Sequence, residues 1–78
     1  MNRRRLPVDV EMSREGTLER LRWKGQWTRV ERRVTAWVIQ GQWWSAEVRR
    51  EYMRVLTTTG VVEVYREGDT WWLSHVLD

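Results

Sequence analysis

Turn sequences recur along this 78-residue chain at the spacing of β-hairpins, and polar and apolar residues alternate between them. The segments 8–12 and 17–23 show this alternation, and the turn Lys24-Gly25 follows directly. A period of two is typical of a half-buried strand, in which neighbouring side chains face opposite ways. No segment carries a helical repeat that does not also fit a strand. The sequence therefore predicts an all-β protein.

Two segments depart from simple alternation. The run Val30 to Val34 interrupts the pattern inside a segment too long for a straight strand, which predicts a bulge or a sharp bend. Residues 45–56 fit a helix capped by Ser45, or a loop at 45–50 followed by a strand; we favour the loop and strand. A hairpin turn is expected at Gln40-Gly41. The expected strands are 8–12, 17–23, 26–39, 42–45, 51–57, 61–66 and 70–76.

A chain of this length forms one domain with a thin core, and it contains no cysteine that could form a stabilising disulfide. Closing a series of short hairpins into a barrel removes their exposed edges. We therefore expect residues 6–78 to form a small SH3-like or partly open barrel of six to seven short antiparallel strands. Residues 1–5 (MNRRR) are expected to form a flexible basic arm.

Tryptophan is unusually frequent, with seven residues, and phenylalanine is absent. Trp is therefore expected to supply much of the core volume, because each large aromatic ring buries about 150–250 Å². Two pairs are adjacent, Trp43 with Trp44 and Trp71 with Trp72. On a strand, one member of each pair enters the core and the other faces out. The sequence leaves open which member is exposed.

The positive charge is concentrated in the first part of the chain. Residues 1–54 carry a net charge of +6 and residues 55–78 a net charge of −3, which together give the overall +3. Of the 14 basic residues, 13 are Arg, and its planar guanidinium binds phosphate and stacks on rings better than Lys does. This composition favours a polyanionic partner.

A candidate binding surface follows the first Trp pair. On a strand, Arg50, Tyr52 and Arg54 share one face, which places two cations and an aromatic ring in a row. The opposing interpretation is that the arginines lie over neighbouring rings within the protein, with Glu47 and Glu51 neutralising part of their charge. The candidate binding residues are Arg3, Arg4, Arg5, Trp43, Trp44, Arg49, Arg50, Tyr52 and Arg54.

Catalytic and metal-binding motifs are not evident. The single histidine, His75, has no obvious relay partner in the sequence, and nothing marks a nucleophile turn. No metal-ligand spacing and no glycine-rich phosphate loop is present. We therefore expect a protein that is not an enzyme and needs no cofactor. The lack of cysteine, of a signal segment and of an apolar run of about 20 residues predicts a cytoplasmic protein without membrane contact.

Several spaced aromatic and Arg positions agree at once with one pattern: W-x-G-x-W-x-R-V, then WW, then R-x-Y-x-R-V, then Y-R. Its positions in this chain are Trp23, Gly25, Trp27, Arg29, Val30, Trp43, Trp44, Arg50, Tyr52, Arg54, Val55, Tyr65 and Arg66. The chain thereby resembles a bacterial family of small proteins of unknown function. That family is related to the C-terminal domain of ImuB, the inactive Y-family polymerase-like protein of bacterial mutasomes.

The chain departs from this family at two places. Family members often carry a second aromatic residue where Met53 stands, and ImuB-type domains often end differently from the segment 75–78 (HVLD). The resemblance implies a link to DNA damage tolerance and supplies no catalytic residues.

Two functions are expected from these observations. The first is a protein-docking module in DNA-associated machinery, whose partner is polymerase-associated or a second copy of the chain. The second is single-stranded DNA or RNA binding through the Arg, Trp and Tyr surface. The sequence allows either a monomer or a homodimer.

Overall fold

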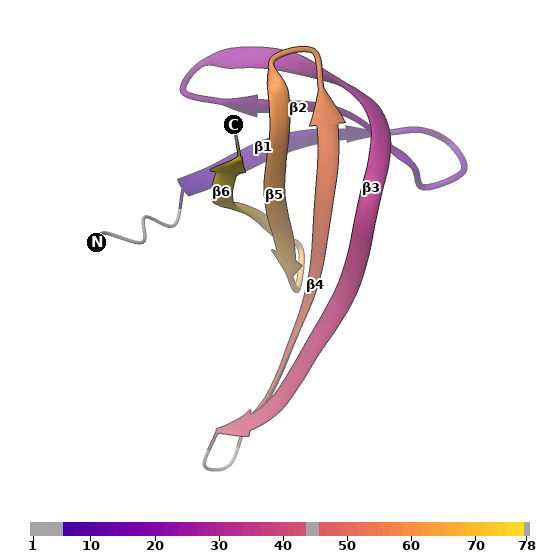
Figure 1. Ribbon diagram of the computed structural model, residues 1–78. Coiled ribbons are helices and arrows are strands. Elements are labelled where there is room, and N and C mark those ends of the chain that lie inside the picture. Colours follow the sequence, from indigo (N-terminus) through magenta and orange to yellow (C-terminus); the bar gives the residue numbers. More distant parts are fainter. Residues whose placement is uncertain (1–5, 44–45, 78) are drawn as a thin grey trace.

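The chain forms a closed barrel of six antiparallel strands in the order β1-β2-β3-β4-β5-β6, which confirms the predicted small all-β barrel (Figure 1). The computed structural model describes residues 6–43 and 46–77, and the side chains of residues 6–41 and 49–77. No helix in these ranges is long and apolar enough to cross a membrane. The strands are β1 (Leu6–Met12), β2 (Leu18–Trp23), β3 (Gln26–Trp43), β4 (Ala46–Thr57), β5 (Gly60–Glu67) and β6 (Thr70–Leu77).

The predicted turn between β2 and β3 is confirmed. Lys24 and Gly25 connect the paired residues Trp23 and Gln26, and both have positive φ angles, 54° and 76°. Two consecutive positive φ values give a turn whose twist matches that of the flanking strands. This turn starts β3 in register with β2.

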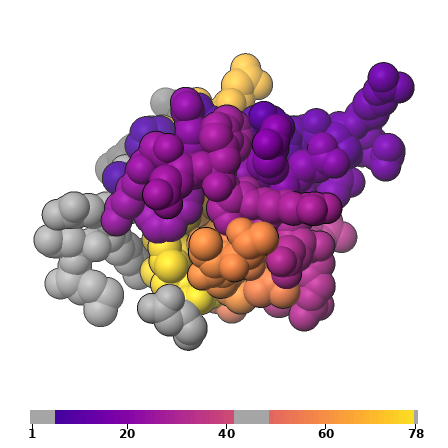
Figure 2. Space-filling view, turned by 90° about the horizontal axis from the view of Figure 1, so that it is seen from above, coloured from indigo at the N-terminus to yellow at the C-terminus, as the bar shows by residue number. Residues whose placement is uncertain are grey.

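The bend predicted within residues 30–34 is also confirmed. The pairing of β3 with β4 shifts between Val30 and Arg32, and again between Arg33 and Thr35. Residues 26–29 of β3 pair with β2, and from Val30 onward β3 pairs with β4. The bulges thus let one 18-residue strand leave β2 and follow β4. In the view onto this end of the barrel, magenta atoms lie beside the orange β4–β5 turn (Figure 2).

The predicted turn at Gln40-Gly41, the short strand at 42–45 and the loop at 45–50 are wrong. β3 continues to Trp43, and β4 is continuous, with Gln40 opposite Arg49. Gly41 does not have the positive φ of the other four glycines, so its backbone is that of an ordinary strand residue. The helical alternative at 45–56 is wrong for the same reason, because β4 pairs along its length with β3.

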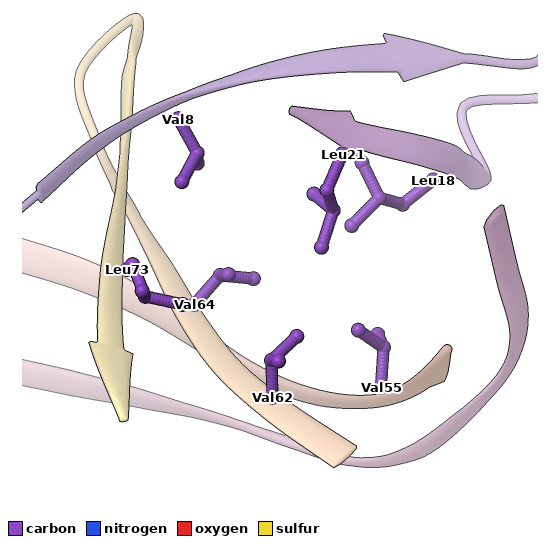
Figure 3. Packing of buried hydrophobic residues seen from close by; sticks show 7 residues of the cluster. All are labelled: Val8, Leu18, Leu21, Val55, Val62, Val64 and Leu73. Carbon is purple, nitrogen blue, oxygen red and sulfur yellow. The ribbon is translucent and has the colours of Figure 1, made fainter. Parts of the chain in front are cut away.

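The core consists of aliphatic side chains, which corrects the expectation that Trp fills it. The side chains point into the barrel from β1, β2, β4, β5 and β6 (Figure 3). Every Trp whose side chain is described is half-buried or exposed. Trp71 packs against the core, and its neighbour Trp72 lies on the opposite face, as predicted for an adjacent pair. The buried cluster is Val8, Leu18, Leu21, Val55, Val62, Val64 and Leu73.

The β3–β4 hairpin extends beyond the barrel. β5 pairs with β4 only from Glu51 onward, whereas the segment 46–50 of β4 pairs with β3 alone. Figure 1 shows this hairpin continuing past the ends of β5 and β6, with β3 along its outer margin. We call residues 35–43 of β3 and 46–50 of β4 the β3–β4 arm.

Candidate interaction surface

Four aromatic residues form one row across the outer face of the barrel. Trp37 of β3 lies opposite Tyr52 of β4, which lies opposite Tyr65 of β5, which lies opposite Trp72 of β6. Pro7 of β1 follows next to Trp72. We call the four aromatic residues the aromatic row. Met53, Val64 and Leu73, which neighbour Tyr52, Tyr65 and Trp72 along their strands, belong to the core or pack against it, so the row faces away from the core.

Three rings of the aromatic row, those of Trp37, Tyr52 and Tyr65, pack on one another. The Trp37 and Tyr52 centroids are 5.3 Å apart with planes 7° from parallel, and the Tyr52 and Tyr65 centroids are 5.0 Å apart at 30°. Stacked pairs of this kind contribute about 0.5–1.5 kcal/mol beyond the area that they bury. Tyr65 is only 3% exposed although it lies on the outer face. The row is therefore a rigid surface in which ring faces already have partners.

Arg50 lies over one side of the row. Its guanidinium carbon is 5.2 Å from the Tyr65 ring centroid, and its Nε donates to Oε1 of Glu67 at 2.9 Å. The side chains of Arg50 and Glu67 are 33% and 37% exposed. This exposed pair is held on the ring by the cation–π contact.

Arg54 has the same arrangement on the other side of the row. Its guanidinium carbon is 5.4 Å from the Trp37 ring centroid, and its Nε donates to Oε1 of Glu63 at 3.0 Å. The row is thus flanked by two cations, each bonded to a carboxylate of β5. The net charge of Arg50, Arg54, Glu63 and Glu67 is zero, from two positive and two negative groups.

Glu63 is the most buried charged side chain beside the row, at 7% exposure. Burial by itself raises the pKa of this carboxyl, but hydrogen bonds from Arg54, Ser74 and His75 outweigh it, so the pKa of Glu63 is lowered. The His75 Nδ1 lies 3.2 Å from its Oε2. Glu63 is therefore ionised at neutral pH and ties β5 to both β4 and β6.

The contacts of His75 do not form a catalytic relay. A relay requires an acid on one ring nitrogen and a nucleophile on the other. Here the Ser74 hydroxyl at 2.9 Å and the Glu63 carboxylate both lie against Nδ1. Within residues 6–41 and 49–77, no group of three potential metal-ligating side chains gathers, and no buried polar side-chain atom lacks a hydrogen-bond partner. The described part of the chain thus shows no arrangement typical of acid–base or metal chemistry.

The predicted surface residues divide into three groups. Arg50, Tyr52 and Arg54 share one face as predicted, and each contacts a ring. Arg49 is exposed on the opposite face, where its charge contributes to lowering the pKa of Glu51; hydrogen bonding from Arg66 is the larger cause. Arg3, Arg4, Arg5 and Trp44, together with the side chain of Trp43, lie outside the described part of the chain.

The rings that contact Arg50 and Arg54 are Tyr65 and Trp37, which the sequence prediction did not include. The neutralising residues also differ from those considered. The Glu51 carboxylate accepts from Arg66 Nη2 at 2.5 Å on the opposite face of β4, and the Glu47 side chain is outside the described residues. The alternation of β4 could have excluded Glu51, because it lies between Arg50 and Tyr52 in sequence and so faces the other way.

A second aromatic site lies on β2 and β3. Trp27 is 43% exposed, and the guanidinium carbons of Arg20 and Arg22 lie 5.6 and 5.4 Å from its ring centroid. Arg20 donates to Glu11 and Arg22 donates to Asp9. The indole is thus held between two ion pairs, with its remaining surface in solvent. We call this group the Trp27 site.

Comparison of the chain with protein-family models, with curated proteins and with solved structures finds no match in any of the three.

Proposed function

We propose that this protein is a non-enzymatic interaction module that docks a protein partner on the aromatic row. The observation that carries the proposal is the alignment of Trp37, Tyr52, Tyr65 and Trp72 across four strands on one outer face. Trp, Tyr and Arg are the residues that contribute most to protein interfaces. A rigid row also loses little side-chain freedom when a partner binds.

The charge around the row favours a protein over a nucleic acid. A polyanion binds chiefly through arginines or lysines that neutralise its phosphates. Arg50 and Arg54 already bond to Glu67 and Glu63, so the surface offers little net positive charge. These ion pairs support a partner whose contact surface is mainly uncharged.

The ring geometry favours the same choice. Single-stranded nucleic acid binders present open ring faces on which bases stack. Trp37 packs in parallel against Tyr52 and also lies under Arg54. The row instead offers ring edges beside the ion pairs, a surface suited to an extended or proline-rich peptide.

The resemblance to the ImuB C-terminal domain supports a polymerase-associated partner within DNA damage tolerance. A purified polymerase-like partner of that machinery can be tested directly, with nuclease treatment to remove bridging nucleic acid. Retained binding after nuclease treatment supports docking between proteins, whereas binding that disappears contradicts it.

The surface itself is tested by selecting extended peptides from a displayed library against the protein. Trp37→Ala should weaken the selected peptides by about 2 kcal/mol or more, which is roughly thirtyfold in Kd. Trp27→Ala is the matched control, because it removes an exposed indole flanked by two arginines on a different face. Equal loss in both variants, with melting temperatures unchanged, would contradict docking on the aromatic row.

Single-stranded nucleic acid binding is a second candidate, which three other arginines favour. Arg29, Arg32 and Arg33 line an open pocket of about 460 Å³ near the β3 bulges, together with Glu19 and Glu31. None of the three arginines forms an ion pair with a carboxylate of the described residues. Arg29 lies on the same face of β3 as Trp27, two residues away.

This second candidate has a distinct signature. Adding a single-stranded oligonucleotide at low salt should quench Trp fluorescence, and added salt should reverse the quenching steeply. Trp27→Ala should remove the effect while Trp37→Ala retains it. Unchanged fluorescence at low salt would exclude nucleic acid from the Trp27 site.

A further inference from the structure

The β3–β4 arm has an unpaired edge. β3 uses one edge to pair with β2, but only over residues 26–29, and the other edge pairs with β4 from Val30 to Trp43. From Val30 onward, the edge of β3 that faces away from β4 therefore pairs with no strand among the described residues. An unpaired edge exposes backbone N–H and C=O groups that can pair with another strand.

This edge lacks the charged side chains that usually prevent strand addition. Residues 34–46 contain no Asp, Glu, Lys, Arg or Pro. Val38 and Ile39 are 49% and 52% exposed, although they stand at the centre of this segment. Proteins usually protect such edges with charges, prolines or bulges. The β3 bulges stop at Thr35, so the chain beyond them is regular.

We propose that two copies of this chain pair their β3 edges in antiparallel orientation, with Val38 at the two-fold axis. Val38 then lies opposite Val38 of the second copy, and Trp37 lies opposite Ile39 of the second copy on both sides of the axis. Pairs of an aromatic with a β-branched residue contribute about 0.2–1 kcal/mol across strands. The interface is isologous, as closed dimers require.

The same register is favoured by charge and by shape. Arg33 falls opposite residue 43 of the second copy, so no like charges meet along the paired segment. The arm extends past the barrel, and antiparallel pairing therefore places the two barrels at opposite ends of the joined sheet (Figure 1).

A short strand pair buries less than the roughly 1,200–2,000 Å² of a stable complex, so the dimer dissociates on dilution. The proposed dimer pairs the backbone edge of β3, which borders the aromatic row at Trp37, and the proposal does not rest on the proposed docking function.

Cysteine cross-linking tests the pairing and its register, because the chain has no cysteine of its own. Residues directly opposite each other in antiparallel strands have Cα atoms about 4.5–5.5 Å apart, within the range that a disulfide spans. Val38→Cys should therefore give a disulfide-linked dimer under mild oxidation. Ala36→Cys is the matched control, because two copies of residue 36 would be about 13 Å apart.

A mixture provides a second check on the register. Residue 36 lies opposite residue 40 of the second copy, so Ala36→Cys mixed with Gln40→Cys should give the mixed disulfide-linked dimer, while neither variant alone should form a disulfide-linked dimer. Val38→Lys should also abolish the rise of molecular mass with concentration in sedimentation of the otherwise native chain. The proposal is overturned if Val38→Cys forms no disulfide-linked dimer, or if it cross-links no better than Ala36→Cys alone.

Discussion

The buried carboxylate beside the aromatic row makes a quantitative prediction about stability. Glu63→Gln keeps the size of the side chain and removes its charge. The Glu63 side chain is 7% exposed and accepts from Arg54 at 3.0 Å. Its second oxygen lies 3.2 Å from the His75 Nδ1. The substitution therefore weakens two links between neighbouring strands without creating a cavity.

The expected cost follows from these contacts. A hydrogen bond that involves a charged group contributes about 1.5–3 kcal/mol. The partner Arg54 is 45% exposed, so water replaces part of the lost interaction. The cost therefore stays below the roughly 3–5 kcal/mol that is lost when a buried charge is left without its partner. We expect Glu63→Gln to lower the free energy of unfolding by about 1.5–3 kcal/mol at neutral pH. For a domain of this size, each kcal/mol corresponds to about 4–8 °C in Tm.

The cost should also depend on pH. The pKa of Glu63 is lower in the folded protein than its ordinary value of 4.5, so the unfolded chain takes up the proton first as the pH falls. The stabilisation by the ionised carboxylate is therefore complete above 4.5 and is lost as the pH falls through the lowered value. The native protein should approach the stability of Glu63→Gln in acid.

Urea denaturation at neutral and acid pH measures both effects. Glu11→Gln is the control, because Glu11 accepts two hydrogen bonds from Arg20 but both side chains are about half exposed. Such an exposed pair contributes about 0–1 kcal/mol. If the two variants lose equal stability, or if the deficit of Glu63→Gln persists unchanged in acid, burial does not control the strength of these ion pairs.

Further predictions concern packing and turns. Leu21→Ala, at a fully buried core position, should lower the free energy of unfolding by about 2–5 kcal/mol in urea denaturation. Gly60→Ala should cost about 1–3 kcal/mol because φ is 129° there, whereas Gly41→Ala should be neutral or slightly stabilising by the same assay. Thr57→Val should lower Tm, because it removes the 2.7 Å hydrogen bond from the Thr57 hydroxyl to the Gly60 carbonyl in the β4–β5 turn; an unchanged Tm would show that water replaces it.

The turns explain which parts of the candidate surface were predictable. The turn between the expected strands 51–57 and 61–66 places Thr57 opposite Gly60, and strand pairing from that point brings Tyr52 opposite Tyr65. The turn at Gly68 brings Tyr65 opposite Trp72 in the same way. Three members of the aromatic row could therefore have been found from turn positions alone, since register follows from the turn in a hairpin.

The fourth member could not be found, because one turn was misplaced. A turn at Gln40-Gly41 would pair Trp37 with Trp44. β3 instead pairs Trp37 with Tyr52. The local sequence does not indicate this pairing, because Gln-Gly fits both a turn and an exposed strand. Local composition does not distinguish the two when the choice depends on pairing with a distant strand.

The two proposed surfaces have a joint consequence. Trp37 and Ile39 lie on the same outer face of β3, two residues apart. Antiparallel strands keep their outer faces on the same side, so the proposed dimer places Ile39 of one copy beside the end of the other copy's aromatic row. The pairing then extends each row across the joined sheet and presents two rows on one face. A partner with two docking segments would gain from the high effective concentration of the second row, even if each single contact were weak. Docking strength would then rise with protein concentration for native chains, and it would lose this dependence in Val38→Lys while single-segment binding stayed the same.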